Sequence, residues 1–311
     1  MTAQERRILI VVHTGRPDSV DAAVRVRDEL VSAGAIAVMD AEQWAELGAD
    51  RERFPLVEVL GRDTELDQVE LAIVLGGDGT ILRAAEVTRG SAAPILGVNM
   101  GHVGFLAESE RDDLDNAVHR VIARDYRVEE RMALDVRVKS SDNEVIYSTW
   151  ALNEATIEKA SRERMLEVVI EIDQRPLSTF GCDGVIVSTP TGSTAYNFSA
   201  GGPVIWPTVE AIALVPLSAH ALFAKPLVVG PEASVAIELM ERTTGRGILW
   251  CDGRRSHDLP PGARVVVRRS AQPVRLARLH TAAFTDRLVD KFRLPVEGWR
   301  GAARTDEGET T

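Results

Sequence analysis

The 311-residue sequence contains only two cysteines, Cys182 and Cys251. Two thiols are too few for a disulfide framework, and their spacing matches no zinc-binding motif. Long apolar runs are missing as well, because no segment approaches the roughly 18 consecutive apolar residues of a membrane-spanning helix. The first apolar run, Ile8–Val12, is too short for the core of a signal peptide. These absences predict a soluble protein of the cytoplasm.

Positive charge is also scarce. The chain has 36 Lys plus Arg against 47 Asp plus Glu, which gives a net charge of −11. Nucleic-acid-binding proteins usually carry a basic footprint, and anionic membranes attract basic segments, so neither partner is expected. Hydrophobic residues make up 45% of the chain, enough for a packed core. An anionic ligand would therefore depend on backbone dipoles, a few cations and a metal.

Short apolar runs alternate with amphipathic stretches in the first third of the chain, which is typical of an α/β layered fold. Buried strands are expected at Ile8–Val12, Leu71–Leu75 and Pro94–Asn99, and a helix over Ile81–Thr88. We expect residues 1–128 to form an α/β domain with a parallel sheet and flanking helices.

The middle of the chain changes to an alternation of apolar and polar residues with a period of two, which indicates half-buried strands. The segments that show it are Met132–Val138, Leu166–Ile172, Ser234–Leu239, Arg264–Arg268 and Val274–Leu279. Closely spaced short strands with few helices predict an all-β, sandwich-like domain, which we place at residues 129–283.

The end of the chain returns to a helical pattern. Phe284, Leu288 and Phe292 recur at helical spacing, so a helix over about residues 284–300 is expected to join the first domain. Residues 301–311 have nothing to bury and are expected to form a disordered tail.

The segment Gly76-Gly77-Asp78-Gly79-Thr80 directly follows an expected strand and precedes an expected helix. Its glycines let the backbone turn tightly and bring N–H groups close to a ligand. The N-terminus of the following helix favours an anion, so the segment predicts a phosphate site. The aspartate would repel phosphate unless it has another role, either as a base for an attacking hydroxyl or as a ligand of a bridging Mg²⁺. A plain strand-to-helix turn capped by Asp78 is the structural alternative.

The same five residue types occur in NAD kinases, in diacylglycerol and sphingosine-type lipid kinases, and in 6-phosphofructokinases. The choice among them comes from three further motifs: Asn99-Met-Gly-His-Val-Gly-Phe-Leu106, Asn153-Glu154, and the glycine- and threonine-rich segment from Gly181 to Pro203. With these motifs in this order, the chain from Ile8 to Trp299 resembles the bacterial NAD kinases, in particular the actinobacterial ones.

This resemblance implies an N-terminal domain like those of diacylglycerol kinase and phosphofructokinase. It also implies a kinase reaction in which ATP or polyphosphate phosphorylates the 2′-hydroxyl of the adenosine ribose of NAD, giving NADP. Asp78 would be the catalytic base, and Mg²⁺ or another divalent cation would accompany the phosphoryl donor. A homodimer or homotetramer is expected from the family, and no metal ligand is assigned among the residues.

The expected nucleotide contacts combine residue chemistry with the resemblance. Backbone N–H groups of the glycine-rich loop and the Arg83 cation suit phosphate, and an Asn-Glu pair suits ribose hydroxyls and an amide. The residues expected to bind nucleotide are Gly76, Gly77, Gly79, Thr80, Arg83, Asn99, Asn153, Glu154, Asp183, Thr191, Thr194, Ala195, Tyr196 and Ser199. Asp252 follows a cysteine as Asp183 does, but it is expected to be structural or peripheral.

Two other functions are compatible with the loop. One is a kinase for a lipid or sugar hydroxyl, although an acidic chain with 5% aromatic residues offers little surface for a membrane. The other is a non-catalytic dinucleotide sensor, for which an aspartate inside a phosphate loop would be a disadvantage. NADP formation from NAD, ATP and Mg²⁺ distinguishes the NAD kinase from both.

Overall fold

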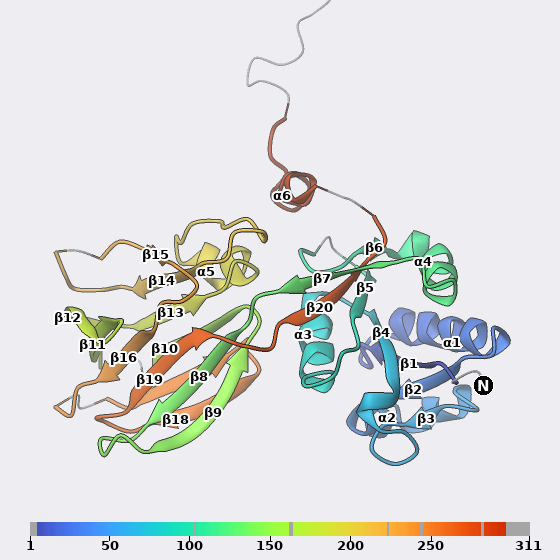
Figure 1. Cartoon of the computed structure of the whole chain (residues 1–311), viewed down its shortest axis with the longest axis horizontal. Helices are drawn as coiled ribbons and strands as arrows, with labels where there is room; N and C mark the ends of the chain where they lie inside the picture. The colour runs from blue at the N-terminus through green and yellow to red at the C-terminus, as the bar shows by residue number, and fades with distance from the viewer. Residues whose placement is uncertain are drawn as a thin grey trace, which may run out of the picture.

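The structure, a computed structural model, describes residues 5–101, 104–161, 164–222, 224–242, 245–280 and 283–296. Figure 1 shows two bodies side by side, a sheet covered by helices and a body made almost entirely of strands. Within the described residues the chain forms one eight-stranded and two six-stranded sheets. The expected α/β region followed by a β-rich region is confirmed. The expected tail, residues 301–311, lies outside the described residues.

The eight-stranded sheet is parallel at its centre. Its path runs β3-β2-β1-β4-β5-β20-β7, and β6 pairs with β5. The elements from the first part of the chain are β1 (Arg7–Val12), α1 (Pro17–Ser32), β2 (Ile36–Met39), α2 (Ala41–Glu46), β3 (Glu58–Val59), β4 (Val69–Leu75), α3 (Asp78–Val87), β5 (Ile95–Asn99), β6 (Ser109–Glu110) and α4 (Leu114–Ile122). The helix expected at Ile81–Thr88 thus begins three residues earlier, at Asp78.

Both faces of the central strands β1, β4 and β5 are buried, which explains their continuous apolar runs. In β1, Ile8 and Ile10 belong to the apolar cluster that includes α1 and α4. Leu9 and Val11 belong to the cluster on the other face, which includes α3. The phosphate-loop segment therefore leaves the carboxyl end of a fully buried strand.

Two strands differ from the expected division of the chain. β7 (Arg127–Arg131) and β20 (Val274–Arg278) lie in the first sheet, with β20 parallel to β5 and antiparallel to β7. The sequence pattern predicts Val274–Leu279 and the residues from 129 onward in the β-rich domain. A period of two identifies a strand but not its partner, and Val274 and Leu276 pack in the cluster that contains Ile95. The domain limits at residues 128 and 283 stay a prediction. β7 crosses the first limit and β20 lies before the second, yet both strands belong to the first sheet.

The second body consists of two antiparallel sheets, ordered β15-β14-β13-β10-β17-β18 and β12-β11-β16-β19-β8-β9. Their apolar side chains form one shared cluster, as in a sandwich. The strands are β8 (Leu134–Lys139), β9 (Val145–Ala151), β10 (Glu154–Lys159), β11 (Leu166–Ile172), β12 (Arg175–Cys182), β13 (Gly184–Ser188), β14 (Ile212–Leu217), β15 (Leu227–Val229), β16 (Val235–Leu239), β17 (Gly247–Cys251), β18 (Arg255–Leu259) and β19 (Arg264–Arg269). Cys182 and Cys251 are buried free thiols.

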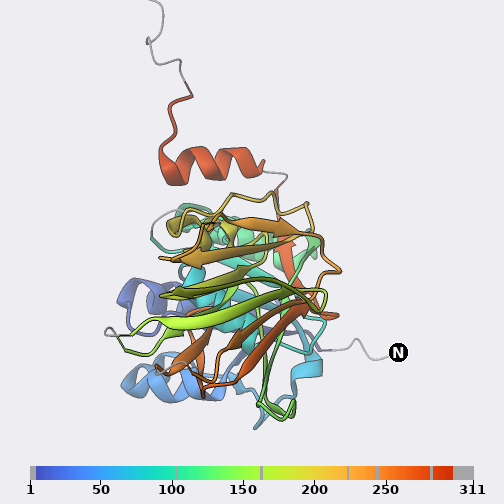
Figure 2. The ribbon, with the colours of Figure 1, turned by 90° about the vertical axis from the view of Figure 1, so that its left-hand side faces the viewer.

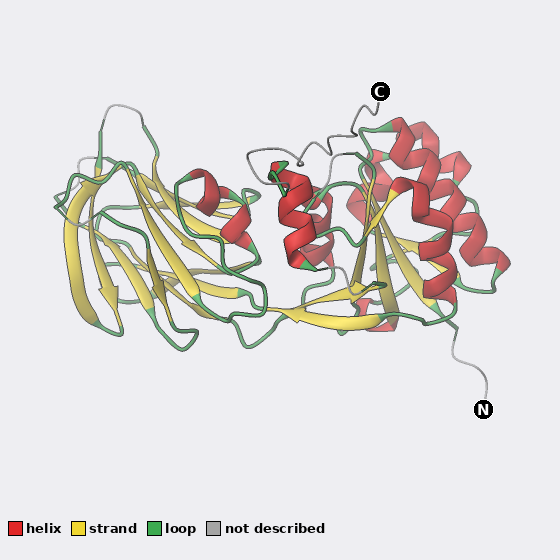
Figure 3. Ribbon diagram, turned by 90° about the horizontal axis from the view of Figure 1, so that it is seen from above, coloured by secondary structure: helices red, strands yellow, loops and turns green. Residues whose placement is uncertain are grey.

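The last helix, α6 (Phe284–Phe292), ends earlier than expected, with Arg293 in the left-handed region at φ 50°. Figures 1 and 3 show α6 over the junction of the two bodies, and Figure 2 shows it as a separate helix beyond the strands. None of the helices in the described residues combines the length and apolar character needed to cross a membrane.

Candidate active site

The glycine-rich loop joins β4 to α3. The Gly76 N–H donates to the Val98 carbonyl at 3.1 Å, which fixes the loop to the neighbouring strand β5. Gly77 is the N-cap of α3, and no side chain caps the helix. Because the first N–H groups of a helix have no partner within it, an uncapped N-terminus is available to an anion. The loop therefore has the geometry expected of a phosphate site.

The three glycines of the loop differ in the space that a side chain would have. A Cβ at Gly76 would lie 2.3 Å from the Thr80 hydroxyl oxygen, so this residue is required by the fold itself. At Gly77 and Gly79 nothing lies within 4 Å of the position of a Cβ. The open side of the loop is thus at Gly77 and Gly79, where a ligand can approach the backbone.

Asp78 lies in the first turn of α3 and is half-buried. Its carboxylate accepts the N–H of Phe105 at 3.0 Å and the N–H of Leu106 at 3.1 Å. The approach is close, because a Cβ at Gly104 would lie 2.4 Å from Asp78 Oδ1. The motif that begins at Asn99 therefore supplies a backbone clamp for Asp78, a role that the sequence pattern does not predict.

Arg83 and Asn99 are occupied by protein partners. The Arg83 guanidinium forms ion pairs with Glu46 at 3.0 Å and with Asp40 at 3.5 Å. The Asn99 amide donates to Glu110 at 2.9 Å and accepts the Gly101 N–H at 3.2 Å. Their expected roles in nucleotide binding stay predictions.

Asn153 and Glu154 lie where β9 turns into β10. Asp252 holds this turn, since its carboxylate accepts the Asn153 N–H at 2.7 Å and the Leu152 N–H at 3.0 Å. Arg255 pairs with the same carboxylate at 2.6 Å. Asp252 thus has a structural role, as expected, but at the candidate site. Its Cys-Asp-Gly segment repeats the one at Cys182–Gly184, which by itself does not place Asp252 at this turn.

The Glu154 carboxyl is buried, and its Oε2 has no hydrogen-bond partner among the described residues. Burial, and then the neighbouring Asp252 carboxylate, raise the pKa of Glu154 to about 8, although the Tyr196 backbone N–H donates to it. An unpaired buried oxygen is costly, and a ligand hydroxyl would satisfy it. The side chain therefore suits a sugar hydroxyl.

The glycine- and threonine-rich segment packs directly on this turn. The Thr189 N–H donates to the Asn153 carbonyl at 2.9 Å, and a Cβ at Gly192 would lie 2.1 Å from that same oxygen. The segment continues as a short 3₁₀ turn at Gly192–Thr194 and α5 (Tyr196–Ser199). The structure thereby brings together Asn153, Glu154, Thr191, Thr194, Ala195, Tyr196 and Ser199, which we call the acceptor segment.

Asp183 lies apart from Glu154 along the same sheet. Glu154 pairs with Ser188, whereas Glu158 pairs with Gly184, so that Asp183 flanks the opposite end of β10. Lys159 forms an ion pair with Asp183 at 2.5 Å and holds the pKa of that carboxyl below its usual value. Its expected nucleotide contact stays a prediction.

The phosphate loop and the acceptor segment meet through α3. Leu152, next to Asn153, belongs to the apolar cluster that contains Leu82 and Ala85 of α3. At the end of α3, Glu86 pairs with Arg255 at 2.9 Å, the same arginine that holds Asp252. The two parts of the candidate site are therefore fixed to one helix.

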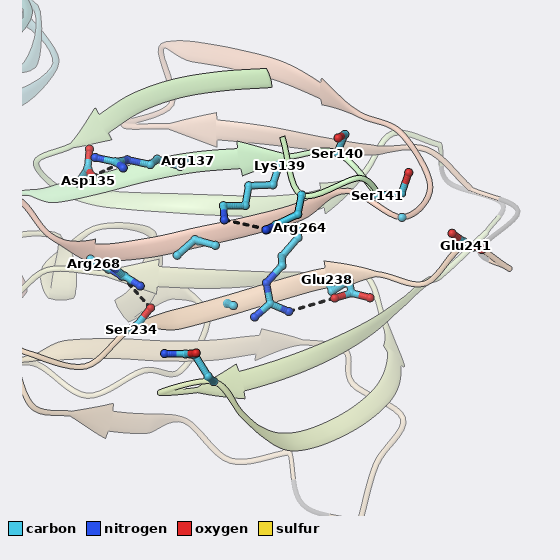
Figure 4. A pocket seen from close by; sticks show the side chains of 15 residues that line it. Asp135, Arg137, Lys139, Ser140, Ser141, Ser234, Glu238, Glu241, Arg264 and Arg268 are labelled. Carbon is cyan, nitrogen blue, oxygen red and sulfur yellow. Dashed lines mark hydrogen bonds and ion pairs between the residues drawn. The ribbon is translucent and has the colours of Figure 1, made fainter. Parts of the chain in front are cut away.

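A hollow of about 700 Å³ lies elsewhere, on the sheet that contains β8, β16 and β19 (Figure 4). Two of its arginines are paired with protein groups: Arg264 with Glu238 at 3.0 Å, and Arg268 with the Ser234 hydroxyl at 2.9 Å. None of the expected site residues lines this hollow. We therefore place the candidate site at the phosphate loop and the acceptor segment.

The raised pKa of Glu154 gives a prediction for stability. In the native protein this side chain keeps its proton up to about pH 8, whereas an ordinary glutamate releases it near 4.5. The stability from this protonated group is therefore complete below pH 4.5 and is lost as the pH rises through about 8. The glutamine of Glu154→Gln cannot ionise. The thermal unfolding midpoint of this variant minus that of the wild type should therefore increase between pH 4.5 and pH 8.

The matched control is Glu144→Gln, at an exposed position in the turn before β9. This variant should keep the wild-type dependence of the unfolding midpoint on pH. Parallel pH profiles for Glu154→Gln and the wild type would contradict the raised pKa.

Family models match both halves of the chain. The model described as "ATP-NAD kinase N-terminal domain" matches residues 8–126, and "ATP-NAD kinase C-terminal domain" matches residues 152–279. The "NAD kinase" of Leifsonia xyli subsp. xyli is 64% identical over 299 residues, which cover 96% of this chain and 98% of that protein. "NAD kinase 2" of Streptomyces coelicolor is 58% identical over 300 residues, covering 96% and 97%.

Solved structures share the fold. The yeast NADH kinase complexed with NADH has a TM-score of 0.81 at 22% identity, covering 98% of this chain and 91% of that one. An NAD kinase from Archaeoglobus fulgidus in complex with ATP has a TM-score of 0.67 at 23% identity, covering 93% and 98%. At these identities the likeness supports the architecture described above.

Proposed function

Because the chain belongs to the NAD kinase family, we propose that it transfers the terminal phosphoryl group of ATP to the 2′-hydroxyl of the adenosine ribose of NAD, giving ADP, NADP and a proton. The observation that carries the mechanism is the placement of Asp78, a carboxylate in the first turn of an uncapped helix and clamped by backbone N–H groups. Such a loop suits phosphate, and such a carboxylate suits the proton of an attacking hydroxyl.

Phosphoryl transfer requires mainly positioning and charge stabilisation. In the proposed mechanism the N–H groups at Gly77 and Gly79 bind phosphate, and Asp78 accepts the proton of the 2′-hydroxyl. Each Asp78 oxygen uses one lone pair on the loop, which leaves another for that hydroxyl. Asn153 and Glu154 orient the ribose, and Tyr196 borders the adenosine.

Mg²⁺ is proposed to accompany the phosphoryl donor. No group of three or more His, Cys, Asp or Glu side chains within the described ranges forms a metal site. Mg²⁺ usually binds to one or two carboxylates together with substrate phosphates and water, and Asp78 offers one such carboxylate in the loop. When bound, the ion neutralises charge on the donor phosphates.

The test is NADP formation by the purified protein with NAD and Mg²⁺, using ATP and polyphosphate as separate donors and EDTA to remove the metal. We expect NADP with ATP and its loss with EDTA. Saturable NAD binding without NADP would indicate a sensor instead. Phosphorylation of a lipid or sugar in the absence of NADP would indicate a different kinase.

Assembly and location are proposed from the family alone. A homodimer or homotetramer is expected, and light scattering of the purified protein measures its mass directly. A cytoplasmic location is expected for the same reason and is tested by cell fractionation.

A further inference from the structure

Helix α6 holds the clamp on Asp78 from the other side. The peptide that joins Phe105 to Leu106 donates its N–H to Asp78 at 3.1 Å. The carbonyl of the same peptide accepts the Arg287 guanidinium of α6 at 2.9 Å. Since a peptide is planar, with its N–H and C=O on opposite sides, fixing the carbonyl also fixes the direction of the N–H. Arg287 therefore fixes the orientation of the Phe105–Leu106 peptide, whose N–H points at Asp78.

A buried carboxylate anchors Arg287. Glu108 has a side chain that is 1% exposed and pairs with Arg287 and with Arg278, each at 3.0 Å. It also accepts the N–H groups of Leu279 and His280 at 2.9 and 2.8 Å. Arg278 and two N–H groups are thus available to stabilise the Glu108 charge without Arg287. The contact specific to Arg287 is the one with the Phe105 carbonyl.

Aromatic contacts tie the same helix to both parts of the site. The Phe105 ring packs on Phe284 and Phe292 of α6, with centroids 6.1 and 5.7 Å apart. Phe292 also packs on Phe198 of α5 at 4.5 Å, and Phe284 on Trp206 at 5.1 Å. α6 therefore bridges the loop that clamps Asp78 and the acceptor segment, in agreement with its place over the junction in Figures 1 and 3.

We propose that Arg287 is a positioning residue for the reaction, which orients the Asp78 carboxylate through the Phe105–Leu106 peptide. The proposal rests on the function proposed above. In the proposed mechanism Arg287 touches neither substrate nor the reacting atoms. Its effect is to keep the Asp78 oxygens aimed at one place, while the aromatic contacts of α6 hold that place relative to the acceptor segment.

The test compares Arg287→Gln with the wild type in the NADP-forming assay. Misplacing a catalytic group by about 1 Å costs on the order of 100-fold in rate, so we expect kcat to fall by about 10- to 100-fold. The KM values for NAD and ATP should stay within about twofold, because binding groups are untouched. The lysine of Arg287→Lys can reach only one of the two acceptors, the Phe105 carbonyl or the Glu108 carboxylate. Its kcat should therefore lie between those of the wild type and Arg287→Gln.

Two further variants separate positioning from a general structural effect. Arg293→Gln makes the same chemical change at an exposed residue just beyond α6 and should keep the wild-type kcat. In an Asp78→Asn background, Arg287→Gln should lower kcat no further, since its effect passes through Asp78. The thermal unfolding midpoint of each variant shows whether the fold is retained.

The outcomes are distinct. Wild-type kcat in Arg287→Gln, or a double variant whose loss is the product of the two single losses, would overturn the positioning role. A rise in the KM for NAD with unchanged kcat would overturn it too, because it would place Arg287 in substrate binding. Absence of NADP formation by the wild-type protein would instead contradict the proposed function. The contacts of Arg287 would then have no role in this reaction.

Discussion

Asp78→Asn is expected to lower kcat for NADP formation by about 10²–10⁴-fold, the usual contribution of a general base. The amide cannot take a proton from the ribose hydroxyl. The KM for NAD should change little, because the acceptor segment is intact. One loop N–H loses its acceptor, so we also expect a loss of stability of about 1–3 kcal/mol, with cooperative unfolding retained.

Steady-state kinetics and thermal unfolding measure the two effects separately. Asp142→Asn, in the exposed turn between β8 and β9, is the matched control and should behave as the wild type in both. A turnover equal to that of the wild type in Asp78→Asn would remove Asp78 as the base. The loop would then be a phosphate site only.

The parts of the site that the sequence predicts best are local ones. Gly76, Gly77 and Asp78 are adjacent in the chain, and the strand before them is a continuous apolar run, so the phosphate loop could be inferred from its neighbours alone. The same holds for Thr191 and Thr194, which share one turn. In such segments the order of the residues along the chain specifies the local turn, as in the Thr194 hydroxyl that donates to the Thr191 carbonyl. The partners that fix Asp78, the N–H groups of Phe105 and Leu106, lie 27 and 28 residues away.

Contacts between distant residues could not be inferred in this way. Arg83 lies one turn beyond the phosphate loop, yet its ion-pair partner Glu46 is 37 residues away on another helix. Glu108 and Arg287 are separated by 179 residues, and the sequence around either residue does not predict a contact with the other. Strand β20 was recognised by its period, but its place beside β5 depends on packing in the first domain.

Gly192→Ala is expected to damage the acceptor segment more than any side-chain truncation within it. The added Cβ would lie 2.1 Å from the Asn153 carbonyl oxygen and 2.3 Å from its carbonyl carbon. That backbone cannot retreat easily, because Asp252 holds the Asn153 N–H and the Thr189 N–H holds its carbonyl. Overpacking of this kind costs about 1–3 kcal/mol, and more where backbone must shift.

The kinetic consequence differs from that of Asp78→Asn. Displacing Asn153 and Glu154 removes ribose contacts made in both the ground state and the transition state, so the KM for NAD should rise by at least about tenfold. Gly230→Ala adds a methyl group where nothing lies within 4 Å, and it should leave stability and kinetics unchanged. A Gly192→Ala protein with wild-type stability and KM would mean that the acceptor nucleotide binds elsewhere. A decrease in kcat with an unchanged KM for NAD would mean that Gly192, like Asp78, affects the chemical step rather than the binding of the acceptor.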